Sequence, residues 1–211
     1  GVQRIEEVVR AIADLFHSIS IEVFPMTSTE YERLEAAGVD GLALYQETYD
    51  PAVYESVHLA GRKRDYARRL RAPEEGGEAD FRTLGIGSLL GLADWRTEAV
   101  ALAMHAAYLS RRFWRSRIAV SFPRLVPASR DFAIPHPVSD EDLVQMMCAL
   151  RLALPDAEMV VSTREPADLR DRMVGLAVTR MSAGSRTSPD GYLTEQAGEQ
   201  FSVVDDRTPA Q

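Results

Sequence analysis

The 211-residue chain has a single cysteine, Cys148, and this scarcity limits the chemistry available to it. One thiol excludes a disulfide within the chain and any metal site built from several cysteines. The four histidines do not compensate, because they lie far apart and share no ligand spacing. We therefore predict no metal site in this chain. Cys148 is expected to be a small buried hydrophobic residue, and His105, within a long helix, a packed or surface residue.

Long apolar runs and an excess of positive charge are also missing. No stretch approaches the roughly 18 apolar residues that span a membrane, and no signal peptide opens the chain, so we predict a cytoplasmic protein without a membrane segment. The net charge of −8 and the isoelectric point near 5.1 argue against nucleic-acid binding, which needs a basic face. Local basic clusters remain compatible with one small anionic ligand, and an example comprises Arg62, Lys63, Arg64, Arg68, Arg69 and Arg71.

Familiar catalytic signatures are missing as well. Ser88 lies in a Gly-Ser-Leu-Leu-Gly run that does not satisfy the Gly-x-Ser-x-Gly pattern of a nucleophilic serine. The glycines between Gly85 and Gly91 match neither the Gly-x-Gly-x-x-Gly dinucleotide pattern nor a P-loop. They indicate instead a backbone packed close to a ligand, or a tight turn.

The chain does contain an alternation of strand and helix patterns. Its hydrophobic content of 45% and charged content of 27% are typical of a globular protein with one core. Apolar and β-branched runs predict strands at 18–24, 41–44, 83–87, 117–122, 158–163 and 178–183.

Helix boundaries are indicated by capping residues and breakers. Helix starts are marked by Thr27 with Glu30, by Asp94, and by Ser139 with Asp142. We expect the helix after Asp94 to end at Arg112 and to present one apolar side made of Val100, Met104, Ala107 and Tyr108. Residues 73–78, with two glycines and three glutamates, predict a solvated loop.

Strands alternating with helices favour parallel βαβ units, whose right-handed crossovers bring all strand carboxyl ends to one face. A barrel and an open doubly wound sheet both satisfy this pattern. A complete barrel needs about 250 residues, so this shorter chain predicts an α/β fold with about six of the eight units of a TIM-type (β/α) barrel. We predict a partial barrel at 1–183, incomplete at its N-terminus, and a partly irregular C-terminal extension at 184–211.

Residues directly after the strands are the candidate functional residues, because ligands bind at that edge in barrels and open sheets alike. The strand ends contain Gln46 with Glu47, Gly87 with Ser88, Ser121 with Arg124, residues 162–165 and residues 182–186. An arginine beside small hydroxyl residues recurs three times, which suits a ligand that carries carboxylates. Exposed strand ends are polar in any protein, however, and Glu47 is also explained by a structural ion pair with an arginine.

Several of these segments, taken in order, resemble one known enzyme family. They are Tyr45-Gln46-Glu47-Thr48-Tyr49, residues 85–96, Ser121-Phe122-Pro123-Arg124, Ser162-Thr163-Arg164-Glu165 and residues 182–188. Together they closely resemble the tyrosine lyase of thiazole biosynthesis, also called 2-iminoacetate synthase, which is a radical S-adenosylmethionine (SAM) enzyme. The resemblance covers nearly the whole chain.

The resemblance implies a radical SAM barrel that holds an iron–sulfur cluster and SAM at its mouth. In this family, reductive cleavage of SAM yields a 5'-deoxyadenosyl radical, and the Cα–Cβ bond of tyrosine breaks to give dehydroglycine and p-cresol for thiamine biosynthesis. The implied small-molecule partner is tyrosine, and the implied protein partner is a thiazole synthase.

The resemblance also implies two groups of ligand-binding residues. The residues expected to face SAM are Gln46, Glu47 and Arg69, of which Arg69 would pair with the SAM carboxylate. The residues expected at the tyrosine end are Ser121, Arg124, Thr163 and Arg164. Whether Arg124 or Arg164 holds the substrate carboxylate stays open.

This sequence departs from the family in its cysteines. The family binds its cluster through Cys-x-x-x-Cys-x-x-Cys after the first strand, whereas this chain has one cysteine in a helical segment. We expect the chain to lack the first two βα units and part of the C-terminal end, and therefore to be inactive alone. The unpaired edges of such a sheet also predict poor solubility.

Two alternative functions remain. The hydrogenase-maturation tyrosine lyase shares the Gln-Glu-Thr-Tyr and Ser-Thr-Arg-Glu segments, although Asp94-Trp95-Arg96 and the segment ending at Arg124 look more like the thiazole enzyme. A non-catalytic ligand-binding or assembly module of the same fold would also retain the anion-binding arginines.

Overall fold

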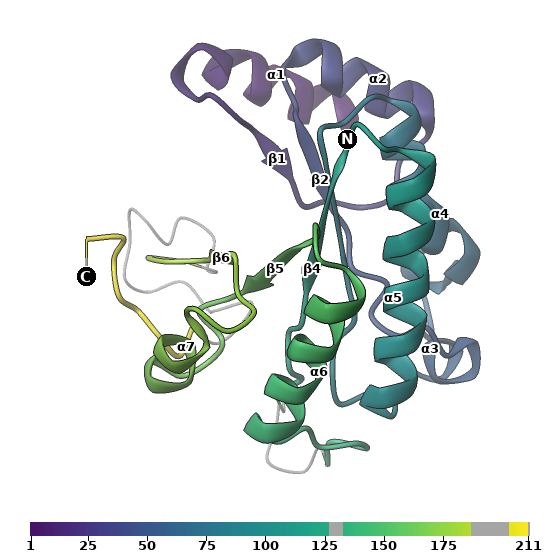
Figure 1. Cartoon of the computed structure of the whole chain (residues 1–211). Helices are drawn as coiled ribbons and strands as arrows, with labels where there is room; N and C mark the ends of the chain where they lie inside the picture. Colours follow the sequence, from purple (N-terminus) through teal and green to yellow (C-terminus); the bar gives the residue numbers. More distant parts are fainter. Residues whose placement is uncertain (127–132, 187–202, 211) are drawn as a thin grey trace.

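The computed structural model describes residues 1–126, 133–186 and 203–210, and its centre is a parallel sheet. The strands follow one another in chain order and are β1 (Ser20–Ile21), β2 (Gly41–Ala43), β3 (Thr83–Gly87), β4 (Arg117–Ser121), β5 (Glu158–Val161) and β6 (Arg180–Met181). A doubly wound sheet reverses its strand order at a switch point, whereas a barrel keeps it sequential. The predicted fold is therefore confirmed, since the six parallel strands form the curved wall of a partial barrel (Figure 1).

Helices connect the strands, and α4, α5 and α6 lie along the outer side of the sheet in Figure 1. The helices are α1 (Val2–Ile12), α2 (Ser28–Ala37), α3 (Pro51–Val57), α4 (Tyr66–Glu78), α5 (Trp95–Arg112), α6 (Asp140–Ala153) and α7 (Ala167–Met173), with 3₁₀ turns η1 (Ala13–Leu15) and η2 (Arg62–Arg64). Capping side chains begin α2, α5 and α6, at Thr27, Asp94 and Ser139, as predicted.

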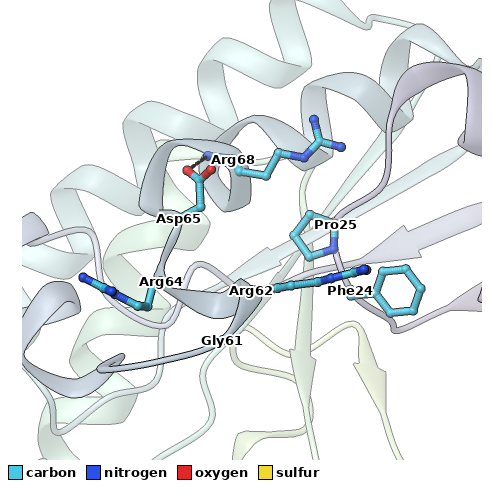
Figure 2. Close-up of a pocket in the computed structure, with 7 residues that line it drawn as sticks. All are labelled: Phe24, Pro25, Gly61, Arg62, Arg64, Asp65 and Arg68. Carbon is cyan, nitrogen blue, oxygen red and sulfur yellow. Dashed lines mark hydrogen bonds between the residues drawn. The ribbon is translucent and has the colours of Figure 1, made fainter.

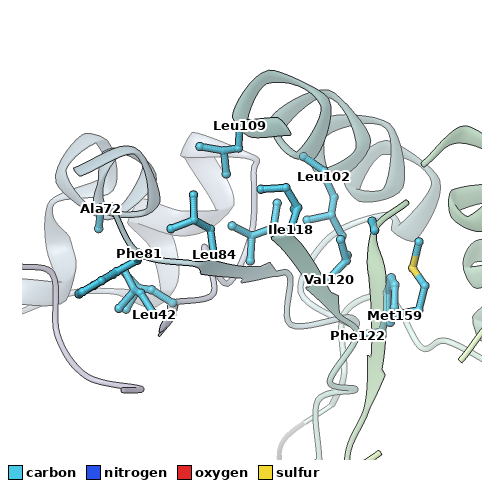
Figure 3. Packing of buried hydrophobic residues seen from close by; sticks show 14 of the residues in the cluster. Leu42, Ala72, Phe81, Leu84, Leu102, Leu109, Ile118, Val120, Phe122 and Met159 are labelled. Carbon is cyan, nitrogen blue, oxygen red and sulfur yellow. The ribbon is translucent and has the colours of Figure 1, made fainter. Parts of the chain in front are cut away.

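The hydrophobic core lies between the sheet and these helices (Figure 3). The strand residues that face it are at most 5% exposed and include Leu42, Leu84, Ile118, Val120 and Met159. Each such side chain contributes about 1.5–3 kcal/mol relative to full exposure. Because this packing uses one side of β1 to β5, the alternate side chains of these strands face the inner, concave side of the sheet.

The predicted loop at 73–78 is wrong, because these residues form the second half of α4. The two glycines permit close packing rather than a turn. A Cβ at Gly76 would lie 3.2 Å from Leu42 of β2, and a Cβ at Gly77 would lie 2.6 Å from the Phe113 ring. Tertiary contact with the sheet therefore outweighs the helix-breaking tendency of Pro73 and the glycines.

The predicted faces of two helices are also corrected. Val100 and Met104 are 62% and 68% exposed, while Leu102 and Leu109 form the buried side of α5. This alanine-rich helix carries two apolar stripes, and contact with the sheet selects the one that the periodicity alone did not favour. In α6, Cys148 is half-buried instead of buried.

The edge strands are shorter than predicted. β1 and β6 contain two residues each, against the expected ranges 18–24 and 178–183. Each of them pairs with only one neighbouring strand, so fewer backbone hydrogen bonds hold its residues in the extended conformation. None of the helices in the described part combines the length and apolarity that crossing a bilayer requires.

The C-terminal segment 203–210 returns to the end of β5. The amides of Val204 and Asp205 donate to the Thr163 carbonyl at 2.8 and 3.0 Å. The Asp205 carboxylate forms a buried ion pair with Arg170. The predicted division at 183/184 stays a prediction, and residues 187 and 188 of the family-like segment lie outside the described residues.

Candidate functional site

The concave side of the sheet is lined by Tyr45 and small residues. Leu44 belongs to the hydrophobic core, so the next residue, Tyr45, faces the concave side. A Cβ at Gly87 would come within 3.1 Å of Tyr45 Cδ1 and 2.6 Å of the Ser121 carbonyl oxygen. Glycine is therefore required at this position. The sequence predicted a close approach of the backbone in this glycine-rich segment. At Gly87 the group that approaches closely is the Tyr45 ring.

A β-bulge follows β2 at Gln46 and Glu47. Gly41 pairs with Thr83 but Glu47 pairs with Ser88, so the β2 side contains one residue more than the β3 side over this stretch. Glu47 has a φ of 74°, a left-handed conformation that costs a non-glycine residue about 1–3 kcal/mol. Bulges of this kind redirect side chains beside binding sites.

The Glu47–Arg69 cluster, which also contains Lys63, lies at this bulge. The Arg69 side chain comes from α4 and is 8% exposed; its Nε donates to the Tyr45 carbonyl at 2.6 Å and its Nη2 to Glu47 Oε1 at 2.9 Å. Lys63 Nζ lies 3.4 Å from the same carboxylate oxygen. The structure thus brings together Glu47 and Arg69, two of the three residues predicted to face SAM.

Two buried polar side chains beside the cluster have no hydrogen-bond partner in the described part of the chain. Gln46 is 2% exposed and both of its amide atoms are unsatisfied; Ser88 is fully buried and its Oγ is also unsatisfied. Each such group costs about 1–3 kcal/mol if nothing pairs with it. The bulge therefore concentrates unused hydrogen-bonding capacity next to Glu47.

Glu98 of α5 fixes the backbone immediately after Glu47, a role that the sequence did not reveal. Its carboxylate is 2% exposed and accepts from Thr48 Oγ1 at 2.6 Å and from the Tyr49 amide at 3.0 Å. Burial raises the pKa of Glu98, although these hydrogen bonds oppose the shift. An acid in the first turn of a helix is common for reasons of the helix dipole, so the sequence carried no specific signal.

A tyrosine–histidine pair supports the same segment. The Tyr49 hydroxyl lies 2.9 Å from His105 Nδ1, and the Tyr66 hydroxyl donates to the Tyr49 carbonyl at 2.9 Å. Burial lowers the pKa of His105 to about 4, so the ring is neutral at pH 7. His105 is thus a packed residue, as predicted, with a defined structural contact.

Charged groups converge on the concave side near Tyr45. Burial lowers the pKa of the Arg164 guanidinium, while Glu165, Glu47 and Glu22 oppose that shift. Burial likewise raises the pKa of Glu22, as does the negative charge of Glu47, whereas Arg164 lowers it. Glu47 and Glu22 are thus near enough to Arg164 for their charges to act on its pKa.

The Ser121 side chain lies beside the Tyr45 hydroxyl. Burial raises the pKa of the Tyr45 hydroxyl, Glu22 adds to the shift, and a hydrogen bond with the Ser121 side chain opposes it. Ser121 is 7% exposed. Tyr45 and Glu22 were missed as site residues. The available signal was that each directly follows a core-facing residue, Leu44 and Ile21, at the end of adjacent strands.

The Arg124–Glu165 cluster, which also contains Asp140, has a different character. Arg124 Nε donates to both Glu165 oxygens at 3.1 Å, and its Nη2 forms a further short contact with Glu165. Its Nη1 donates to Asp140 Oδ1 at 2.8 Å and to the Val138 carbonyl at 3.1 Å. All three guanidinium nitrogens therefore bind protein groups and join three segments of the chain.

A cavity of about 310 Å³ lies beside this cluster and brings Arg124 and Arg164 together. Its other walls are mainly apolar and include Leu90, Leu125 and Val138. Thr163 is 3% exposed, and its carbonyl anchors the C-terminal segment. The binding roles predicted for Arg124, Arg164 and Thr163 stay predictions.

Metal ligands are sparse in the described ranges. Within residues 1–126, 133–186 and 203–210, no group of three or more His, Cys, Asp or Glu side chains is arranged to hold a metal ion. The only cysteine, Cys148, lies in α6.

Comparison with known proteins places this geometry in context. Residues 121–211 match the model of the Biotin and Thiamin Synthesis associated domain. The chain is 42% identical over 201 residues to the 2-iminoacetate synthase of Escherichia coli K12, which covers 94% of this chain and 53% of that protein. The chain therefore spans about half the length of this curated relative.

Two solved structures are similar to nearly the whole of this chain. The [FeFe]-hydrogenase maturase HydG superposes with a TM-score of 0.90 at 34% identity, covering 99% of this chain and 47% of HydG. HydG from Carboxydothermus hydrogenoformans gives a TM-score of 0.88 at 37% identity, covering 99% of this chain and 49% of that structure.

Proposed function

This chain belongs to the 2-iminoacetate synthase family, and we propose that it forms the SAM- and tyrosine-binding part of a radical SAM tyrosine lyase. The proposed reaction cleaves the Cα–Cβ bond of tyrosine to give dehydroglycine and p-cresol for thiazole synthesis. One observation supports the proposal: Arg69 pairs with Glu47 beside the unsatisfied Gln46, at a strand end where barrels bind ligands.

The Glu47–Arg69 cluster fits the chemistry of SAM. We assign the SAM carboxylate to Arg69, whose buried guanidinium is oriented by the Tyr45 carbonyl and Glu47. The Glu47 carboxylate is suited to accept hydrogen bonds from the ribose hydroxyls or the amino group of SAM. The unsatisfied side-chain amide of Gln46 is suited to donate and to accept such bonds. Bound SAM would supply a 5'-deoxyadenosyl radical, with release of methionine, when an electron donor outside this chain reduces it.

The tyrosine end is proposed around Arg164. Arg124 is fully engaged with Glu165, Asp140 and a carbonyl, so taking a substrate carboxylate would break existing ion pairs. Arg164 lines the cavity beside the Arg124–Glu165 cluster, and we assign the substrate carboxylate to it. Ser121 and Thr163 would contribute hydroxyl groups at this end.

The residues present do not fit an iron–sulfur cluster, because the chain has one cysteine and that residue lies in α6. We propose that the 211-residue chain alone does not cleave SAM under reducing conditions. Production of 5'-deoxyadenosine by the purified chain would contradict this.

The assignment of Arg164 can be tested in the complete gene product. The Arg164→Ala variant should raise the KM for tyrosine by roughly tenfold or more, because a charge-assisted hydrogen bond to the substrate is lost. The KM for SAM should change little. Rates of p-cresol release at varied tyrosine provide the measurement, and an unchanged tyrosine KM would refute the assignment.

The same assay separates the related function. A 2-iminoacetate synthase stops at dehydroglycine and p-cresol, whereas a hydrogenase-maturation lyase proceeds to carbon monoxide and cyanide. Absence of tyrosine-dependent p-cresol in the complete protein would favour a non-catalytic binding or assembly module. Association with a thiazole synthase is proposed from the family alone and is tested by co-purification.

A further inference from the structure

The segment between Arg62 and Arg71 is unusually basic for this acidic protein. It contains six basic residues and one acidic residue, Asp65, whereas the whole chain has a net charge of −8. Gly61 precedes it with a φ of 77°, and a Cβ there would meet no other atom, so only the backbone conformation favours glycine. This turn leads into η2, which presents the first arginines to solvent.

A hollow of about 630 Å³ lies over this segment (Figure 2). It is lined by Phe24, Pro25, Gly61, Arg62, Arg64, Asp65 and Arg68. Phe24 and Pro25 follow β1, and η2 follows β2, so the hollow lies at the carboxyl end of the strands. Its lining does not include Glu47 or Arg69.

Most charges near the hollow are already paired. Arg68 Nη1 contacts Glu75 at 2.9 Å, and Lys63 turns toward Glu47. The Asp65 carboxylate accepts from the Arg68 amide at 2.9 Å as the cap of α4.

Two cations remain. Arg62 and Arg64 are exposed, and neither forms an ion pair with any residue that the structure describes. An anion with about two negative charges would balance them. A phosphoryl group carries that charge, and its oxygens match the donor fork of guanidinium.

The arrangement of the arginines indicates an extended anion. Figure 2 shows Arg62 and Arg68 reaching toward Phe24 and Pro25, while Arg64 extends to the other side. Because these guanidinium groups diverge, a diphosphate, which has two phosphoryl groups to share between them, suits them better than a single phosphate. The Phe24 side chain, 39% exposed, adds an apolar wall beside Arg62.

We propose that this hollow binds the diphosphate group of a small molecule, at a site separate from the proposed SAM and tyrosine sites. Arg62 and Arg64 bind the phosphoryl oxygens, and Arg68 contributes positive charge at the edge. The site requires no residue of the Glu47–Arg69 cluster, so it stands independently of the proposed function.

Titration calorimetry of the purified chain with pyrophosphate at low salt tests the proposal. The double variant Arg62→Ser, Arg64→Ser should weaken pyrophosphate binding by roughly tenfold or more. The matched control Arg111→Ser, Arg115→Ser removes the same charge from two exposed positions, one in the last turn of α5 and one just after it, and should leave the affinity within about twofold. Equal losses in both double variants, or no binding by the unmodified chain, would overturn the proposal.

Two further measurements refine the result. A nucleotide is identified as the source of the diphosphate if ADP binds with higher affinity than pyrophosphate and the Phe24→Ser variant binds both with equal affinity. Equal affinities would identify free diphosphate or a small phosphorylated compound. Competition between SAM and pyrophosphate would contradict the separate site and merge the hollow with the SAM site.

Discussion

Two arginine–glutamate clusters at the same edge of the sheet differ in what they leave unsatisfied. In the Arg124–Glu165 cluster, every guanidinium nitrogen binds a protein acceptor. In the Glu47–Arg69 cluster, the glutamate adopts a left-handed conformation, and the adjacent Gln46 has no partner among the described residues. The first cluster therefore resembles a structural joint, and the second a site prepared for a ligand.

The difference shows that an ion pair alone does not identify function. Both clusters pair an arginine with a carboxylate, and both follow strands of the same sheet. Backbone strain and unsatisfied buried polar groups reduce stability, so they persist mainly where another requirement maintains them. These two features occur together only around Glu47 among the strand ends that the structure describes.

The largest expected effect tests the structural cluster. Arg124→Ala leaves the Glu165 carboxylate, whose side chain is 5% exposed, without its main partner. Breaking a buried pair costs about 3–5 kcal/mol, so the free energy of unfolding in urea should fall by about this amount. Arg172→Ala removes an ion pair between two exposed side chains and should cost about 1 kcal/mol or less. A loss below about 1 kcal/mol for Arg124→Ala would place this cluster with the ligand sites.

The next effect concerns the support of the Glu47 segment. The pKa of His105 falls from 6.5 to about 4 on folding, so the unfolded chain binds the proton first as the pH decreases. The corresponding stability is complete above pH 6.5 and declines toward pH 4, by up to about 1.4 kcal/mol per pH unit. Between pH 8 and pH 5 the loss should be about 2 kcal/mol.

His105→Gln should flatten this decline relative to the unmodified chain, while His17→Gln, at an exposed position, should not. Urea unfolding at several pH values measures both. Glu98, whose pKa is raised mainly by burial, contributes with the opposite sign, so the comparison uses differences between variants. Parallel curves for His105→Gln and the unmodified chain would show that the tyrosine–histidine pair does not support this segment.

Local patterns in the sequence predicted much of the fold. Capping side chains such as Thr27 and Ser139 act within one helical turn, so their effect is visible without knowledge of the fold. Alternating apolar residues predicted the parallel strands and the edge at which Glu47 and Arg164 lie. The sequence could not reveal α4 through Pro73, because that helix depends on contacts of Gly76 and Gly77 with distant residues.

The details of the candidate site were less predictable. Glu98 and Thr48 are 50 residues apart in sequence, and their hydrogen bond exists only because α5 packs against the end of β2. The bulge at Glu47 depends on the register between two strands, which no pattern within one strand reveals. Glu22 follows an edge strand whose short length hid its relation to Tyr45.

The smallest expected effect isolates the strain that distinguishes the two clusters. Glu47→Gly and Glu47→Gln both remove the ion pair with Arg69, but only glycine also relieves the left-handed conformation. Glu47→Gly should therefore exceed Glu47→Gln in free energy of unfolding by about 1 kcal/mol. Asp80, the other described non-glycine residue with positive φ, serves as a control outside the site. The free energy of unfolding of Asp80→Gly should exceed that of Asp80→Asn by about 1 kcal/mol at most. If the two Glu47 variants are equally stable, Glu47 is not strained, and the contrast with the Arg124–Glu165 cluster rests on the unsatisfied Gln46 and Ser88 alone.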